Sequence, residues 1–172
     1  RDPGSAELLK QIGVHNPNIS ITADPAFALE PAGSERIDEI FGRIGLQTGE
    51  TVIGVALRPW KQLKASSFVP MMKRLSEETG KRLLFMPMQP PGDLHFSVEI
   101  AAELENRAVI AAEALSPEET LGLVHRMDML IGMRLHALIF AASQKVPFMA
   151  ISYDPKVDQL AELLALKRFA VS

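Results

Sequence analysis

The stretch DMLIGMRLHALIFAASQKVPFMAISYDPK, residues 128–156, alternates between two kinds of apolar pattern. Short uninterrupted apolar runs at 128–133 and 147–153 enclose a segment, 135–144, whose apolar residues recur at helical spacing. Uninterrupted apolar runs of this length are typical of parallel strands that are covered on both faces. The stretch therefore predicts a strand, a helix and a second strand of an α/β protein.

The same alternation extends over most of the chain. It predicts six strands, near residues 51–57, 82–88, 108–112, 128–133, 147–153 and 169–172. Helices are predicted between them, near residues 68–79, 94–105, 117–127, 135–144 and 156–166. Ser116, Pro117 and Glu119 carry the sequence pattern of a helix N-terminus with a capping box. The pattern as a whole predicts a Rossmann-like, doubly wound parallel sheet.

The first 50 residues follow a different pattern. They predict a short helix near 5–12, a strand at 18–24 and a helix near 35–44, with a proline-rich stretch before the last of these. We therefore expect residues 1–31 to be the remnant of an amino-terminal half with its linker, and residues 32–172 to form the Rossmann-like domain. The chain begins with arginine and stops on an apolar run, so we expect a piece of a longer protein.

The composition excludes several classes of protein. The chain has 172 residues, of which 47% are hydrophobic, enough to bury a core. A formal net charge of −3 provides no general field for nucleic acid or an anionic membrane, so any anion site must be local. The chain has no cysteine, which favours a reducing compartment, and no apolar run approaches the about 18 residues of a membrane span. We expect a cytoplasmic protein.

Polar or charged residues follow several of the predicted strands, and most of them are basic. Arg58 follows the first strand, residues 89–93 the second, Arg134 and His136 the fourth, and Lys156 the fifth. Ligands of open parallel sheets bind outside the carboxyl ends of the strands. A helix N-terminus with an arginine beside it is well suited to phosphate or carboxylate. The sequence therefore predicts an anion site at this edge of the sheet.

Each of these residues also has a purely structural interpretation. The sequence is equally compatible with Arg134 capping a neighbouring carbonyl and with His136 as a half-buried, hydrogen-bonded core residue. On residue type alone, a solvated surface role is favoured for Lys156, and stacking on the nearby indole is favoured for Arg58. Asp93 is expected to cap the helix that follows it.

Several catalytic signatures are absent. The chain has no Walker loop, no glycine-rich dinucleotide fingerprint, no nucleophile elbow and no HExxH motif. Its four histidines lack metal-ligand spacing, so no metal site is expected. Kinase, nicotinamide dehydrogenase and serine hydrolase functions are therefore disfavoured.

Six motifs occur in order along nearly the whole chain: RDPGS from residue 1, ITADPAFAL from 21, VALRPW from 55, MPMQPPGD from 86, GMRLHALIFAA from 132 and VPFMAISYDPKV from 146. Together they resemble the polysaccharide pyruvyl transferase family, closest to its CsaB-type branch. The resemblance implies the carboxyl-terminal half of a GT-B-like two-domain enzyme that moves the pyruvyl group of phosphoenolpyruvate onto two hydroxyls of a sugar as a ketal. In that branch the acceptor is an N-acetylmannosamine residue of a cell-wall polymer that anchors S-layer proteins.

The resemblance also implies roles for particular residues. His136 matches the catalytic histidine. Contacts to phosphoenolpyruvate are implied for Arg134, Leu135, Lys156, Arg1 and, with weaker support, Arg58. Asp24 lies in another matched motif, with no particular role implied. No cofactor is implied beyond phosphoenolpyruvate as the donor substrate, and the other partners are a lipid-linked or polymeric saccharide and the missing amino-terminal half. We expect the fragment alone to be inactive.

Two further hypotheses remain open at this point. The same fold and anion site suit the donor domain of a GT-B glycosyltransferase or a nucleotide-sugar epimerase. They also suit a non-catalytic module that binds phosphosugars. The ligand that stabilises the protein, and the effect of removing the imidazole of His136, distinguish these hypotheses from the transferase.

Overall fold

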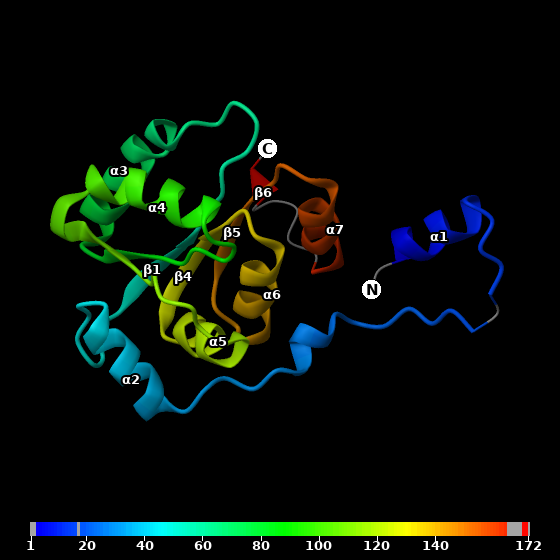
Figure 1. The fold of residues 1–172 in the computed structure, drawn as a ribbon, viewed down its shortest axis with the longest axis horizontal. Helices are drawn as coiled ribbons and strands as arrows, with labels where there is room; N and C mark the ends of the chain where they lie inside the picture. The colour runs from blue at the N-terminus through cyan, green and yellow to red at the C-terminus, as the bar shows by residue number, and fades with distance from the viewer. Residues whose placement is uncertain (1–2, 17, 165–169, 172) are drawn as a thin grey trace.

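A single parallel sheet with helices on both faces forms the body of the molecule in a computed structural model, which describes residues 3–16, 18–164 and 170–171 (Figure 1). Every neighbouring pair of strands is parallel, in the order β3-β2-β1-β4-β5-β6. The strands are β1 (Val52–Ala56), β2 (Arg82–Phe85), β3 (Ala108–Ile110), β4 (Met127–Gly132), β5 (Phe148–Ile151) and β6 (Ala170–Val171). The predicted doubly wound α/β fold is confirmed.

The helices divide between the two faces of the sheet. One face is covered by α3 (Val69–Thr79) and α4 (Gly92–Ala102), together with the short 3-10 helix η2 (Ala65–Ser67). The other face is covered by α2 (Ser34–Arg43), α5 (Pro117–His125), α6 (Leu135–Ser143) and α7 (Pro155–Leu163). A further 3-10 helix, η3 (Glu105–Arg107), precedes β3. The predicted helices of the α/β body therefore all form, with ends shifted by a few residues.

Alternate residues of the central strands supply the two halves of the core. In β1, Val52 and Ala56 pack towards the layer that contains α5 and α6, whereas Ile53 and Val55 pack towards α3 and α4. All five residues of β1 are buried. Because side chains of a strand alternate between faces, a strand buried on both sides must be apolar throughout, which is the pattern found in the sequence.

The amino-terminal segment is less closely attached to this body. α1 (Pro3–Gln11) buries none of its residues and lies at the end of an extended chain (Figure 1). The strand predicted at 18–24 is wrong, because residues 18–24 take up no strand structure. A strand requires a hydrogen-bonded neighbour, and the described sheet offers none here. The segment joins the body through η1 (Pro25–Ala28), where Phe27 packs against the core.

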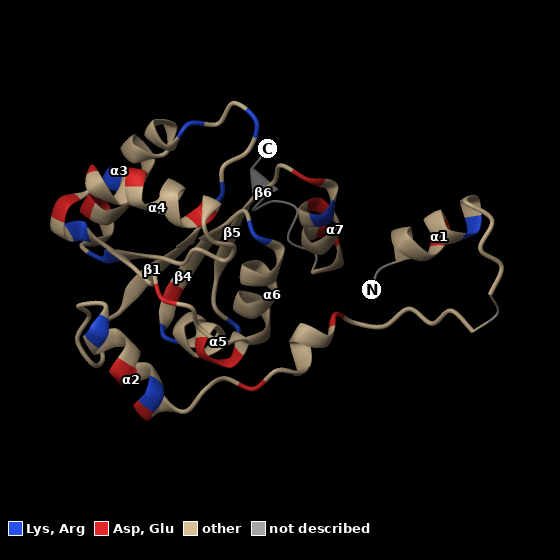
Figure 2. Cartoon of the chain, in the orientation of Figure 1, with Lys and Arg blue, Asp and Glu red and all other residues tan. Residues whose placement is uncertain are grey.

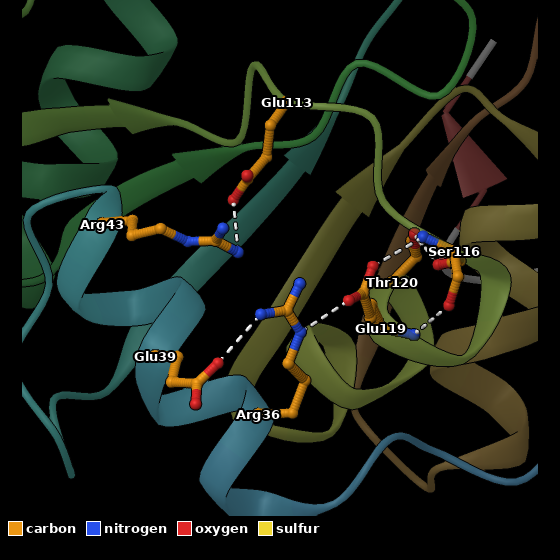
Figure 3. A network of polar contacts seen from close by, with 7 residues as sticks. All are labelled: Arg36, Glu39, Arg43, Glu113, Ser116, Glu119 and Thr120. Atoms are coloured by element: carbon orange, nitrogen blue, oxygen red, sulfur yellow. Dashed lines mark hydrogen bonds and ion pairs between the residues drawn. The ribbon is translucent and has the colours of Figure 1, made fainter.

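A polar network attaches α2 to α5 (Figure 3). Arg36 Nε donates to Glu119 Oε1 at 2.7 Å, and Arg36 Nη1 donates to Glu39 Oε2 at 2.9 Å. The predicted capping box is confirmed: the N–H of Glu119 donates to Ser116 Oγ at 3.1 Å, and the N–H of Ser116 donates to Glu119 Oε2 at 2.8 Å. The Ser116 N–H, and then Arg36, hold the pKa of Glu119 below the usual value for glutamate.

No described helix combines the length and the apolar character that a membrane crossing requires. The feature of the fold that bears on function is the edge of the sheet at which the parallel strands end.

Candidate functional site

The strand order reverses between β1 and β4, and a basic residue follows each of these two strands. From β1 the chain proceeds to β2 and β3 on one side, and then crosses to β4, β5 and β6 on the other. Ala56 pairs with Gly132, and Gly132 pairs with Ala150, so β1, β4 and β5 end at one level. In open α/β sheets, ligands bind outside the carboxyl ends of the strands at such a reversal. We call this edge, at the carboxyl ends of β1, β4 and β5, the crevice.

Arg134 lies at this crevice and has a fixed set of partners. It is the N-cap residue of α6, with extended backbone angles (φ −83°, ψ 122°), and its side chain is 15% exposed. Its Nε donates to Asp93 Oδ2 at 2.8 Å, its Nη2 to Asp93 Oδ1, and its Nη1 to Gln89 Oε1 at 2.9 Å. The guanidinium is therefore bound by an ion pair on one edge and does not cap a carbonyl.

Asp93 is the second residue of α4, just after the loop that follows β2, and it is completely buried. It lies in the first turn of α4, whose N-cap is Pro91, so the predicted capping role of Asp93 is wrong. Besides Arg134, its Oδ2 accepts the backbone N–H of Gln89 at 3.0 Å. A buried carboxylate needs a partner charge and further hydrogen bonds, and Asp93 has both.

Arg58, after β1, is enclosed by aromatic rings instead of carboxylates. Its Cζ lies 5.2 Å from the ring centroid of Trp60 and 5.4 Å from that of Tyr153. Its Nη1 donates to the hydroxyl of Tyr153 at 3.2 Å, while its Nε is buried and has no hydrogen-bond partner. The predicted stacking on the indole is thus present. Within the described residues Arg58 has no acidic partner, so its charge is uncompensated.

His136 and Lys156 are exposed on the first turns of their helices. The imidazole of His136, the second residue of α6, is exposed and makes no side-chain hydrogen bond within the described part of the chain, so it is not the half-buried core histidine of the structural interpretation. Leu135, before it, is half-buried against the core. Lys156 follows β5 in the first turn of α7, where Asp154 Oδ1 accepts its backbone N–H at 3.0 Å; its ammonium has no ion-pair partner among the described residues.

The remaining candidates lie elsewhere. Arg1 is outside the described residues. Asp24 is the N-cap of η1, where its Oδ1 accepts the N–H of Ala26 at 3.0 Å.

No three His, Asp or Glu side chains of the described residues are grouped so as to hold a metal ion. A hollow of about 490 Å³ lined by Pro147, Phe148 and Leu164, among others, opens at the amino end of β5, away from the crevice.

The electrostatic balance of the crevice follows from these contacts. The carboxylate of Asp93 offsets the charge of Arg134, whereas Arg58 and Lys156 have no ion-pair partner within the described part of the chain. Basic residues at the beginning of α6 and α7 occupy neighbouring parts of the same edge (Figure 2). Two basic side chains without an ion-pair partner among the described residues, an arginine fork and helix N-termini suit a small, multiply charged anion.

Two of the residues that build this site have no functional role predicted from the sequence. Asp93 was expected only as a cap, and Tyr153 was expected only as part of a strand. Their partners, Arg134 and Arg58, are 41 and 95 residues away in the chain. The one local signal is that Tyr153 closely follows β5 and that Asp93 begins the helix after β2, at the edge where connections from different strands meet.

Comparison with solved structures places the domain in a class. The fold is similar to that of a glycosyl transferase family 9 protein from Veillonella parvula DSM 2008, with a TM-score of 0.52 and 19% sequence identity. The match covers 84% of this chain and 41% of the glycosyltransferase chain, so this chain spans less than half of that protein. The described domain is therefore an α/β domain of the GT-B type, and the likeness concerns the fold alone.

The family follows from the sequence itself. The family profile of polysaccharide pyruvyl transferases matches residues 1–155, and the chain belongs to that family. No curated protein matches the chain. The family is described as that of a transferase, which pyruvylates polysaccharides.

Proposed function

We propose that the chain is the donor-binding half of an enzyme that transfers the pyruvyl group of phosphoenolpyruvate to two hydroxyls of a cell-wall sugar, as a ketal. The observation that carries this proposal is the placement of Arg58 and Arg134 after the two strands at which the order reverses, with His136 exposed in the first turn of the helix that Arg134 begins. Family membership supplies the reaction type, and the charge at the crevice agrees with an anionic donor.

The basic residues have distinct parts in this proposal. Arg134 uses three of the five N–H donors of its guanidinium on Asp93 and Gln89, which leaves two for the donor. Arg58 and Lys156 add charge that no carboxylate of the described residues offsets. Together with Arg1 and the backbone at Leu135, they hold the donor and stabilise the phosphate as it leaves.

His136 is the acid and base of the proposed reaction. A proton added to C3 of the enol turns C2 into an oxocarbenium ion, to which the first sugar hydroxyl adds while losing its own proton. The C2–O bond to phosphate then breaks, and the second hydroxyl adds to C2 and gives up a proton, which completes the ketal. Histidine exchanges protons readily near neutral pH, and the exposed ring of His136 is accessible to substrate.

The acceptor in this proposal is an N-acetylmannosamine-type residue of a lipid-linked or polymeric cell-wall saccharide, modified in the cytoplasm as in the CsaB-type branch. The acceptor binds mainly to an amino-terminal half, of which residues 1–31 are the remnant and linker, whereas residues 32–172 form the donor domain. Support comes from the amino-terminal segment, where Leu8, Ile12 and Ile21 are 58%, 67% and 55% exposed. Large apolar side chains gathered on one segment are typical of a surface that another domain covers.

The ligand that raises the unfolding temperature of the intact protein tests the proposal. We expect stabilisation by phosphoenolpyruvate and none by a uridine-diphosphate sugar, because only the first matches the proposed donor. Stabilisation by the nucleotide sugar alone would instead favour a glycosyltransferase or epimerase donor domain.

Turnover of His136→Ala separates an enzyme from a binding module. We expect kcat for ketal formation to fall by a factor of about 100 or more, with donor binding little changed, because general acid–base catalysis contributes about 10²–10⁴-fold. The exposed His125→Ala, at the end of α5, is the matched control for loss of an imidazole. Full activity of His136→Ala would remove this residue from the mechanism.

A further inference from the structure

Arg134, Asp93 and Gln89 form a closed set of contacts at the crevice. Both carboxylate oxygens of Asp93 accept from Arg134, and Gln89 Oε1 accepts from its Nη1 at 2.9 Å. The loop is also closed on itself, because the N–H of Gln89 donates to Asp93 Oδ2 at 3.0 Å and the N–H of Asp93 donates to the carbonyl of Gln89 at 3.3 Å. Three of the five N–H donors of the guanidinium are therefore engaged, and these three hydrogen bonds fix the orientation of its plane.

The burial of Asp93 shows which part of this set is permanent. Its residue exposure is 0%, so removal of its partner would leave an uncompensated charge in the interior. An incoming anion therefore does not displace Asp93 from Arg134. It meets a guanidinium whose charge is already offset and whose two remaining donors are held in place.

From these contacts we infer that Asp93 and Gln89 are positioning residues, which orient Arg134 towards the donor. The carboxylate of Asp93 also offsets the positive charge of Arg134. The inference rests on the proposed function, since it assumes that the donor binds at Arg134. According to this inference, Arg58 and Lys156, which have no ion-pair partner among the described residues, attract the donor electrostatically. Arg134 fixes the orientation of the bound donor. Asp93 therefore weakens donor binding electrostatically and at the same time makes the bound geometry productive.

Gln89→Met tests the orienting part without endangering the fold, because Gln89 is exposed and its partner retains Asp93. In the intact protein we expect kcat to fall several-fold and the KM for phosphoenolpyruvate to rise modestly, with an unchanged unfolding temperature. Gln47→Met, an equally exposed glutamine in the turn before β1, is the matched control and should retain wild-type kinetics. Wild-type kcat and KM in Gln89→Met would overturn the orienting role.

Asp93→Asn tests the electrostatic part. The asparagine has the same size but no charge, so Arg134 gains net charge and loses its fixed orientation. We expect tighter binding of phosphoenolpyruvate, by calorimetry, together with a kcat at least tenfold lower and a lower unfolding temperature. A role in packing α4 against α6 alone would lower the unfolding temperature and leave both kinetic constants unchanged, and that result overturns the inference.

The unmodified protein separates this inference from the proposed function. If it neither binds nor consumes phosphoenolpyruvate, the proposed function fails and the inference fails with it. If it is active and both variants are kinetically normal, the inference alone fails. If Asp93→Asn does not fold, the kinetics of Gln89→Met against Gln47→Met decide the outcome.

Discussion

Nη1 of Arg58 lies 3.2 Å from the hydroxyl oxygen of Tyr153, although the two residues are 95 positions apart in the chain. The hydrogen bond joins the loop after β1 to the loop after β5 and so passes over the intervening β4. Trp60 packs edge-on against the same tyrosine, with ring centroids 4.8 Å apart. Arg58 is therefore held at the crevice by aromatic contacts, which fix its position and leave its charge available.

Arg58→Gln should weaken donor binding. The substitution removes an uncompensated charge, and a charge-assisted hydrogen bond is worth about 1.5–3 kcal/mol, which corresponds to a dissociation constant for phosphoenolpyruvate about tenfold or more higher. Titration calorimetry on the intact protein measures this dissociation constant. The control is Arg74→Gln on α3, where the side chain is 78% exposed and pairs with Glu78. Equal affinities of the two variants would mean that Arg58 does not contact the donor.

Gly122→Ala should destabilise the fold at the contact between α2 and α5. A Cβ at this position would lie 2.5 Å from Cδ1 and 2.8 Å from Cγ1 of Ile37, a side chain that is itself buried. Overpacking of this kind costs about 1–3 kcal/mol in the free energy of unfolding, as measured by denaturant titration. Gly42→Ala in α2 is the control, since a Cβ added there would have no neighbouring atom within 4 Å, and it should be neutral or slightly stabilising.

Ile37→Val in the background of Gly122→Ala provides a second check. Removal of the Cδ1 methyl group should restore part of the lost stability, because the closest contact disappears. Additive losses in the double variant would show that the cost at Gly122 has another origin.

Glu119→Gln should reduce the pH dependence of stability in acid. The pKa of Glu119 is held below its ordinary value, mainly by the N–H of Ser116 and then by Arg36, so the folded state binds its proton less readily than the unfolded state does. The stabilisation is complete above the ordinary glutamate pKa and disappears as the pH falls through the lower folded value.

Denaturant unfolding between about pH 7 and about pH 3 measures this difference. The variant should be less stable than the unmodified protein at neutral pH and should lose less stability on acidification. Glu99→Gln, on the exposed side of α4, controls for the loss of one surface charge. Parallel stability curves for Glu119→Gln and the unmodified protein would contradict the role of the network in Figure 3.

Leu8→Gln and Ile12→Gln should lower the unfolding temperature of the intact protein if another domain covers the amino-terminal segment. The two side chains are 58% and 67% exposed in the described chain, and burial of such a side chain contributes about 1.5–3 kcal/mol. Val98→Gln on α4, 48% exposed, is the control on the body of the domain. Unchanged unfolding temperatures for Leu8→Gln and Ile12→Gln would show that the segment remains solvated.

Much of the fold was predictable from local pattern. The strands of the body form where the sequence has apolar runs, and Ser116 caps its helix through the backbone N–H of Glu119, as its position predicts. The strand at 18–24 was wrong because the apolar pattern of a strand does not reveal whether a neighbouring strand exists to pair with it.

The sequence by itself determined the parallel sheet and placed Arg58, Arg134, His136 and Lys156 after its strands, because hydrophobic periodicity and helix caps are properties of consecutive residues. Only the tertiary structure decided the state of each charge: Arg134 is paired with buried Asp93, and Arg58 lies against the rings of Trp60 and Tyr153. These contacts join loops 41 and 95 residues apart, and their energy depends on burial and distance, neither of which a linear sequence contains.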